Sequence, residues 1–172
     1  MLVALIFVIF PFCMLFAAIS DMVSMTIANR VSAVLVATFV VVAPLTGMDW
    51  TAYGLHLAAG LLVLSVTFTL FALGGMGGGD AKLLAATSVW MGLSMTLIQY
   101  LVIASIIGGF LTLAILAYRK SILAVYTKQN MFLRHFADEK VGIPYGVALG
   151  IGGLLTFPES PLAMWALQRL AS

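Results

Sequence analysis

Long apolar runs separated by short polar segments dominate the hydropathy pattern of this chain. The runs cover residues 2–19, 31–47, 54–73, 81–97, 99–118 and 141–157, with a short apolar tail at 161–171. A transmembrane helix needs about 20 apolar residues to cross a hydrocarbon core roughly 30 Å thick. The pattern therefore predicts an all-α polytopic membrane protein, a bundle of about six transmembrane helices.

The fourth and fifth runs are the least clearly separated. Residues 81–97 and 99–118 almost touch, so a tight turn around Leu97–Gln99 is required if both runs cross the membrane. A continuous, tilted or re-entrant segment is the alternative. The fourth run is also the most polar, with two threonines and two serines, which predicts a place inside the bundle.

The composition supports a membrane protein, because 63% of the residues are hydrophobic and 8% are charged. Soluble proteins average about 25% charged residues. Six spans use most of the 172 residues, so we expect a single transmembrane domain over 1–172. The basic residues are scattered through loops instead of forming a contiguous patch, and nucleic acid is therefore not an expected partner.

The distribution of the basic residues predicts the orientation. With the N-terminus outside, the cytoplasmic segments carry seven of the eight lysines and arginines, in line with the positive-inside bias. They are Arg30, Lys82, Arg119, Lys120, Lys128, Arg134 and Lys140. No basic residue precedes the first run, so we expect a retained helix and not a signal peptide. The polar stretch from Tyr118 to Lys140 becomes a cytoplasmic loop, either solvated at the headgroups or docking a substrate.

Two aspartates fall on the same predicted membrane face. Asp21 follows the first run, and Asp80 ends the glycine-rich segment GGMGGGD at 74–80, between the third and fourth predicted helices. Two neighbouring carboxylates share one proton, so one of them can activate water while the other donates a proton. The pair therefore predicts an intramembrane aspartyl endopeptidase that requires no metal and no cofactor. Taken singly, each aspartate is equally explained as a helix cap.

The neighbours of Asp80 suggest how its carboxylate acts. At the predicted start of a helix it accepts free backbone amides and lies at the positive end of the helix dipole, which favours Asp80 as the general base and Asp21 as the protonated partner. Gly77 and Gly79 are expected to allow backbone conformations and a close peptide approach that a Cβ would forbid. Lys82 is expected to tune the charge of Asp80, to hold a lipid phosphate, or to act as a positive-inside anchor.

Three segments resemble the type IV prepilin peptidases. They are Ser20-Asp21, GGMGGGDAKLLAA at 74–86, and IPYGVA at 143–148. The resemblance covers essentially the whole chain, and the length is similar to the short members found with tight-adherence (Flp-type) pilus systems. It implies that Asp21 and Asp80 are catalytic. Pro144, Tyr145 and Gly146 then line the peptide cleft, although a simple helix start explains them equally well.

The resemblance also implies the reaction and its place. The enzyme removes the short basic leader of Flp-type prepilins and pseudopilins, cutting after a glycine at the cytoplasmic face of the bacterial inner membrane. Its expected partners are these substrates and the lipid bilayer, and the sequence does not indicate an oligomeric state. Longer members carry paired Cys-x-x-Cys motifs and methylate the new N-terminus, whereas this chain has one cysteine and gives no support for methyl transfer. Family members often have Ile-Pro-Asn where this chain has Ile27-Ala28-Asn29.

Other classes of function remain open. A small ion- or proton-coupled transporter would use Asp21 and Asp80 to bind a cation or relay protons, and it predicts a carboxylate near mid-membrane. A non-catalytic subunit of a secretion or pilus assembly machine would need them only as caps. Presenilins and signal-peptide peptidases share the Gly-x-Gly-Asp block, but they have Tyr-Asp at the first aspartate, which Ser20-Asp21 does not match. Archaeal preflagellin peptidases would share the chemistry and differ only in substrate. His56 and His135 are not expected to act on the aspartates.

Overall fold

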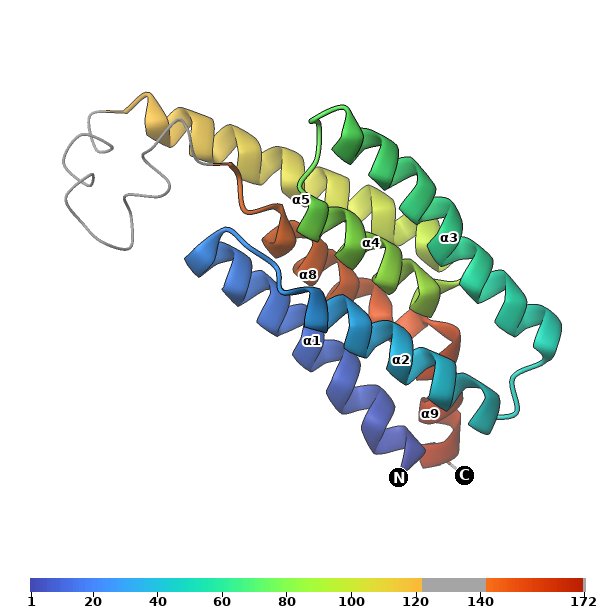
Figure 1. Cartoon of the computed structure of the whole chain (residues 1–172). Coiled ribbons are helices and arrows are strands. Elements are labelled where there is room, and N and C mark those ends of the chain that lie inside the picture. Colours follow the sequence, from blue (N-terminus) through green and yellow to red (C-terminus); the bar gives the residue numbers. More distant parts are fainter. Residues whose placement is uncertain (122–141, 172) are drawn as a thin grey trace.

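All regular structure in the described part of the protein is helical. The computed structural model describes residues 1–121 and 142–171. Its elements are α1 (Leu2–Ser24), α2 (Asn29–Leu45), α3 (Trp50–Ala72), α4 (Gly78–Met91), α5 (Met95–Arg119), α8 (Tyr145–Thr156), the short 3₁₀ helix η1 (Phe157–Glu159) and α9 (Pro161–Ala171) (Figure 1). The predicted all-α class is confirmed.

Three of these helices, α1, α3 and α5, are long and apolar enough to cross a membrane. Two further segments, Tyr145–Glu159 (α8 with η1) and Pro161–Ala171 (α9), pass the same test when taken together. The chain bends by 47° between them, and together they form a fourth candidate span. By contrast, α2 has 17 residues and α4 has 14, fewer than the roughly 20 that a full crossing needs. The structure therefore supports a polytopic membrane protein, while the count of six spans is not confirmed.

The break between α4 and α5 lies earlier than the sequence predicted. Residues 97–99 lie inside α5, and the chain turns at residues 92–94 instead. Gly92 has φ +68° and donates its N–H to the Ser88 carbonyl at 2.9 Å, so it ends α4 with a conformation that glycine adopts readily. The break carries no charge, which is why the hydropathy pattern did not show it.

Substitution of Gly92 by alanine is expected to destabilise the fold. A backbone with φ 68° and ψ 179° is open almost only to glycine and costs an L-residue about 1–3 kcal/mol, and a Cβ at Gly92 would lie 2.8 Å from Cε1 of the buried His56 ring. We expect a clear loss in the thermal unfolding midpoint of the detergent-solubilised protein. The matched control is Gly109→Ala, where no atom lies within 4 Å of the added Cβ. Equal midpoints for the two variants would contradict this account of the turn.

The core of the bundle is built around α4, as its polar residues predicted. Every residue from Leu83 to Met91 is buried, and the Thr87 and Ser88 hydroxyls donate to the Leu83 and Leu84 carbonyls one turn earlier. Trp90 is fully buried and donates its indole N–H to the Leu35 carbonyl at 3.0 Å. Because these polar groups are satisfied locally, α4 packs inside the bundle and holds its N-terminal turn in a fixed position.

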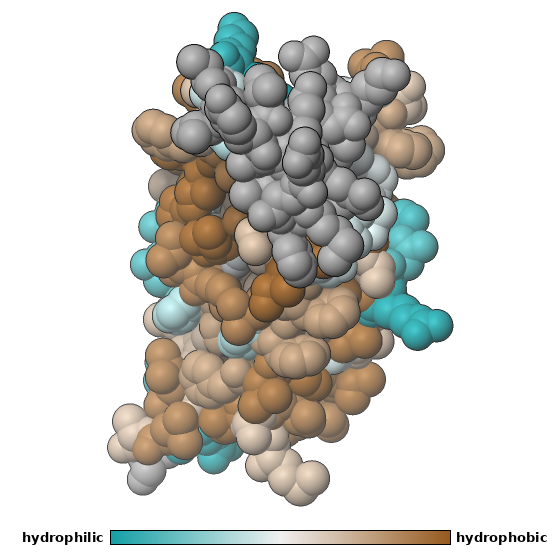
Figure 2. Space-filling view, turned by 90° about the vertical axis from the view of Figure 1, so that its left-hand side faces the viewer, coloured by the Kyte–Doolittle hydropathy of each residue, from teal (hydrophilic) through white to brown (hydrophobic). Residues whose placement is uncertain are grey.

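The outer surface of the bundle suits a lipid environment. Figure 2 shows hydrophobic side chains over much of one face of the molecule. Large side chains on the candidate spans are well exposed, for example Phe12 at 65%, Phe68 at 61% and Phe110 at 69%. Soluble monomers rarely expose apolar patches of this extent, so the exposed faces of α1, α3 and α5 are expected to contact acyl chains.

Candidate active site

Asp21 is fixed by a contact from the far end of the chain. It lies in the last turn of α1 and is 5% exposed. Its Oδ2 accepts a hydrogen bond from the backbone N–H of Gly146, in the first turn of α8, at 2.6 Å. The helix ends just beyond, at Met25, whose φ is 53° and whose N–H donates to the Asp21 carbonyl. Asp21 therefore joins the end of α1 to the start of α8.

The turn after α1 packs between two glycines. A Cβ at Gly79 would lie 3.2 Å from the Ile27 Cβ, and a Cβ at Gly146 would lie 2.7 Å from the Ile27 Cδ1. Ala28, which stands where family members often have proline, has φ −65°. Since a proline ring fixes φ at about −65°, the backbone here already has the shape that the proline would impose.

Asp80 lies in the first turn of α4 but does not cap the helix. The N-cap is Gly77, Asp80 is the third helical residue, and no side-chain cap hydrogen bond is present. The expectation that its carboxylate accepts the free amides of this helix was wrong, because the helix begins at Gly78 and an N-cap side chain must precede it. The carboxylate instead lies over Gly77, where a Cβ would come 2.7 Å from Oδ2.

The glycines before Asp80 act mainly by leaving space. Gly77 has φ −69° and ψ 141°, an extended conformation open to any residue. The positive φ in this segment belongs to Gly74, at +75°, whose N–H donates to the Phe71 carbonyl at the end of α3. Conformational freedom is therefore needed at Gly74, while Gly77 and Gly79 are small because Asp80 and Ile27 occupy the space beside them.

One pocket brings the two aspartates together. It has a volume of about 530 Å³ and is lined by Asp21, Met25, residues 74–77, Asp80, Thr112, Gly142, Ile143 and Tyr145. Its walls come from the end of α1, the segment between α3 and α4, the C-terminal third of α5 and the start of α8. The pocket is partly open to the outside of the bundle.

The two carboxylates interact electrostatically across this pocket. Burial and the negative charge of Asp21 together raise the pKa of Asp80 to about 7. A raised pKa in one of two neighbouring carboxyl groups is what proton sharing requires. The residues that the structure describes contain no group of three or more His, Cys, Asp or Glu side chains that would hold a metal ion. The pocket therefore contains two carboxyl groups that interact electrostatically.

Comparison with known protein families identifies the chain. The profile of the type IV leader peptidase family matches residues 8–113, more than half of the 172 residues, and this span contains both aspartates and the glycine-rich segment. The chain belongs to the type IV leader peptidase family. Comparison with the curated proteins and with the solved structures gives no match. Family membership implies that the protein is a peptidase, which is a hydrolase. The family predicted from the sequence is therefore confirmed, whereas the Flp-type subgroup stays a prediction.

The other predicted site residues of this leader peptidase are divided between the pocket and its surroundings. Tyr145 lines the pocket, and its ring packs on Gly108 of α5, where a Cβ would collide with it. Pro144 is the buried N-cap residue of α8 and does not line the pocket. Lys82 also lies outside it, because its Nζ donates to Asn29 Oδ1 at 3.0 Å on another side of α4.

Seven residues that line the pocket of this leader peptidase were not predicted as site residues from the sequence: Met25, Gly74, Gly75, Met76, Thr112, Gly142 and Ile143. Thr112 lies within an uncharged run, and its hydroxyl donates to the Gly108 carbonyl at 2.7 Å. The only signal in the sequence was a small residue followed one turn later by a polar one. His56 is remote from the pair, bonded through Nδ1 to the Val89 carbonyl near the other end of α4, and His135 lies outside the described residues.

Proposed function

We propose that this leader peptidase is an aspartyl endopeptidase that removes the short basic leader of Flp-type prepilins and pseudopilins, cutting after a glycine. The observation that carries the proposal is the meeting of Asp21 and Asp80 in one open pocket. They come from different helices, and a third helix holds Asp21 through the Gly146 amide. A pocket with two interacting carboxylates supports water activation and proton donation within one site.

The hydrogen bond from Gly146 supports a division of roles. Asp21 Oδ2 faces an N–H donor and must act as an acceptor there, whereas the pKa of Asp80 is raised to about 7, so Asp80 holds the shared proton below this pH. Asp21 then takes a proton from the attacking water, and Asp80 stabilises the oxyanion and donates a proton to the leaving amine. This is the reverse of the assignment from sequence, which rested on Asp80 accepting the free amides of α4 and on the positive end of the helix dipole.

The proposed roles predict a pH dependence. Asp80 must be protonated, and its pKa is raised to about 7, so the active form is present below this value and is lost as pH rises through it. We expect kcat/KM for prepilin cleavage to fall above about pH 7, approaching tenfold per pH unit. Initial rates in proteoliposomes across this range test it, with circular dichroism confirming the fold at each pH. A flat profile up to pH 9 would contradict a protonated Asp80.

The distribution of charge supports an active site on the cytoplasmic face. Arg30, Lys82 and Arg119 lie at helix ends on the side of the bundle that carries the aspartates. At the opposite end, Arg169 lines a pocket with Met1 and residues 45–47. Because basic residues favour the cytoplasmic side, we infer that the N-terminus is outside, in the inner membrane of a bacterium. Residues 122–141 of the long polar loop lie outside the described residues.

The same geometry gives less support to the alternatives. A transporter calls for a carboxylate near mid-membrane, whereas Asp21 and Asp80 lie in the last and first turns of their helices. A purely structural role calls for caps, and Asp80 caps nothing. A peptidase is also what family membership implies.

Co-expression with candidate substrates tests the proposed specificity. A Flp-type prepilin and a pseudopilin are each produced with the wild-type enzyme, and the intact mass of each is measured. We expect both to lose the leader after its last glycine, and replacement of that glycine by leucine in the substrate to block the cut. Unprocessed substrates beside a well-expressed enzyme would contradict the proposal, and a proton or cation flux in proteoliposomes would then favour transport.

A further inference from the structure

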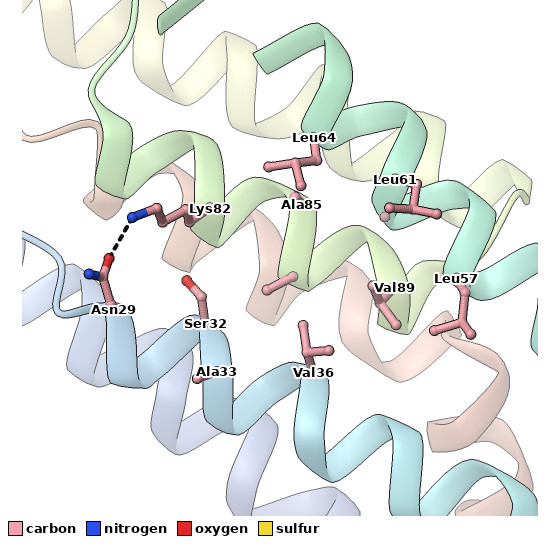
Figure 3. Close-up of a pocket in the computed structure, with 12 residues that line it drawn as sticks. Asn29, Ser32, Ala33, Val36, Leu57, Leu61, Leu64, Lys82, Ala85 and Val89 are labelled. Carbon is pink, nitrogen blue, oxygen red and sulfur yellow. Dashed lines mark hydrogen bonds between the residues drawn. The ribbon is translucent and has the colours of Figure 1, made fainter. Parts of the chain in front are cut away.

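A second hollow in the bundle has no part in the proposed reaction. It is a groove of about 490 Å³ between α2, α3 and α4. Figure 3 shows Leu57, Leu61 and Leu64 of α3 on one side and α2 on the other, with α4 as the floor. The walls are hydrophobic except at one end, where Asn29, Ser32 and Lys82 meet. The groove is therefore hydrophobic over most of its length and polar at one end.

The groove and the active-site pocket lie on different sides of α4. Lys82, Ala85 and Val89 follow one another along α4 at the spacing of a single helix face and line the groove. Asp80 precedes Lys82 by two residues, which is about 200° around a helix axis, and it lines the other pocket. An occupant of the groove thus leaves the aspartates accessible.

The polar end of the groove has an excess of donors. The Lys82 ammonium donates to the neutral Asn29 Oδ1 at 3.0 Å, and no ion pair forms with it in the described part of the chain. Ser32 is 9% exposed, its Oγ has no hydrogen-bond partner among the residues that the structure describes, and it points into the space between α2 and α4 (Figure 3). A buried hydroxyl without a partner is unfavourable, so this end is suited to an anionic group that accepts hydrogen bonds.

We propose that the groove binds an anionic phospholipid, with one acyl chain along α4 and the phosphate at Lys82. The eight residues from Lys82 to Val89 span about 10 Å of helix, enough for half of an extended acyl chain to lie against hydrophobic side chains. The flexible lysine stem lets the ammonium reach the headgroup layer. The negative leaflet that attracts basic residues is the cytoplasmic one, on the side proposed for the aspartates.

A prepilin helix is a poorer occupant of this groove. A substrate with its scissile bond between Asp21 and Asp80 is held at the pocket formed with α1, α5 and α8, while the groove opens between α2 and α3. The prepilin leader is also basic, so its positive charge would be repelled by Lys82. Charge and position therefore both favour a lipid.

A crosslinker placed in the groove tests the proposal locally. A photoreactive residue replaces Leu61, which lines the groove and is 65% exposed. The protein is reconstituted in vesicles of equal parts phosphatidylglycerol and phosphatidylcholine, and mass spectrometry identifies the adducts. We expect phosphatidylglycerol adducts to exceed phosphatidylcholine adducts about fivefold, which corresponds to about 1 kcal/mol for one basic residue at a membrane surface.

Substitutions of Lys82 and of the nearby Arg30 distinguish a specific lipid site at Lys82 from a general attraction of anionic lipids to basic residues. Lys82→Gln is expected to bring the adduct ratio to about one, and Lys82→Arg to keep most of the preference. Arg30→Gln removes a cation that lines a different pocket, between α1 and α2, and is expected to leave the ratio within twofold of wild type. Equal losses in Lys82→Gln and Arg30→Gln, no preference in the wild type, or capture of a co-reconstituted prepilin at Leu61 would each overturn the proposal.

Discussion

Replacement of either Asp21 or Asp80 by asparagine is expected to lower the rate of prepilin cleavage by about a thousandfold or more. General acid and base steps each contribute about 10²–10⁴-fold, and a carboxamide neither takes a proton from water nor holds one to donate. Asparagine keeps the size of aspartate, so both variants are expected to fold. The rates are measured in membranes with the amount of each variant determined by immunoblot.

The matched control for these variants is Asp49→Asn. Asp49 is the N-cap of α3 and its Oδ2 accepts the Thr51 N–H at 2.9 Å, far from the pocket that contains Asp21 and Asp80. Asparagine caps helices about as well as aspartate, so this variant is expected to retain wild-type cleavage. Efficient processing by a well-expressed Asp21→Asn or Asp80→Asn enzyme would rule out catalysis by the pair.

Replacement of Gly146 by alanine is expected to lower kcat by about a hundredfold. The added Cβ would lie 2.8 Å from Asp21 Oδ2 and 2.7 Å from Ile27 Cδ1, so either the carboxylate or the start of α8 must move. The movement also disturbs the 2.6 Å hydrogen bond that holds Asp21. A displacement of about 1 Å in a catalytic group is enough to cost about 10²-fold in rate.

Gly142→Ala is the control for Gly146→Ala, because no atom of the described residues lies within 4 Å of a Cβ built at Gly142. Gly142 also lines the pocket, so the pair separates positioning of Asp21 from a general effect of bulk at the site. Steady-state kinetics are expected to show a loss of kcat for Gly146→Ala with a smaller change in KM. Similar kinetics for the two variants would contradict a positioning role for the Gly146 amide.

The helices and the aspartates could be predicted from the sequence because their signals are local. Each apolar run corresponds to helix in the described residues, and Asp21 and Asp80 stand out in a chain with 8% charged residues. The positive-inside pattern placed both on one side, and the structure brings both into one pocket. A break within a hydrophobic run, however, leaves no mark in the hydropathy pattern. The predicted turn was therefore placed at residues 97–99, whereas α4 ends before Gly92.

The arrangement of the site depends on contacts between segments that are far apart in the sequence. Such contacts cannot be predicted from a single sequence by local patterns. Nothing near Asp21 indicates that the Gly146 N–H, 125 residues away, donates to it. The capping role assigned to Asp80 failed because α4 begins at Gly78 and not at Asp80. Lys82 follows Asp80 by two residues, yet the helix turns it to the groove beside Asn29. Sequence proximity was thus a poor guide to the neighbours of the carboxylates.

The most direct test of catalysis by Asp21 and Asp80 is the intact mass of a Flp-type prepilin after incubation with purified, reconstituted enzyme. Wild type, Asp21→Asn and Asp80→Asn are compared at equal concentrations in the same vesicles. We expect the wild type to release the leader after its last glycine and neither variant to do so. Cleavage by either variant at a rate near that of the wild type would contradict it.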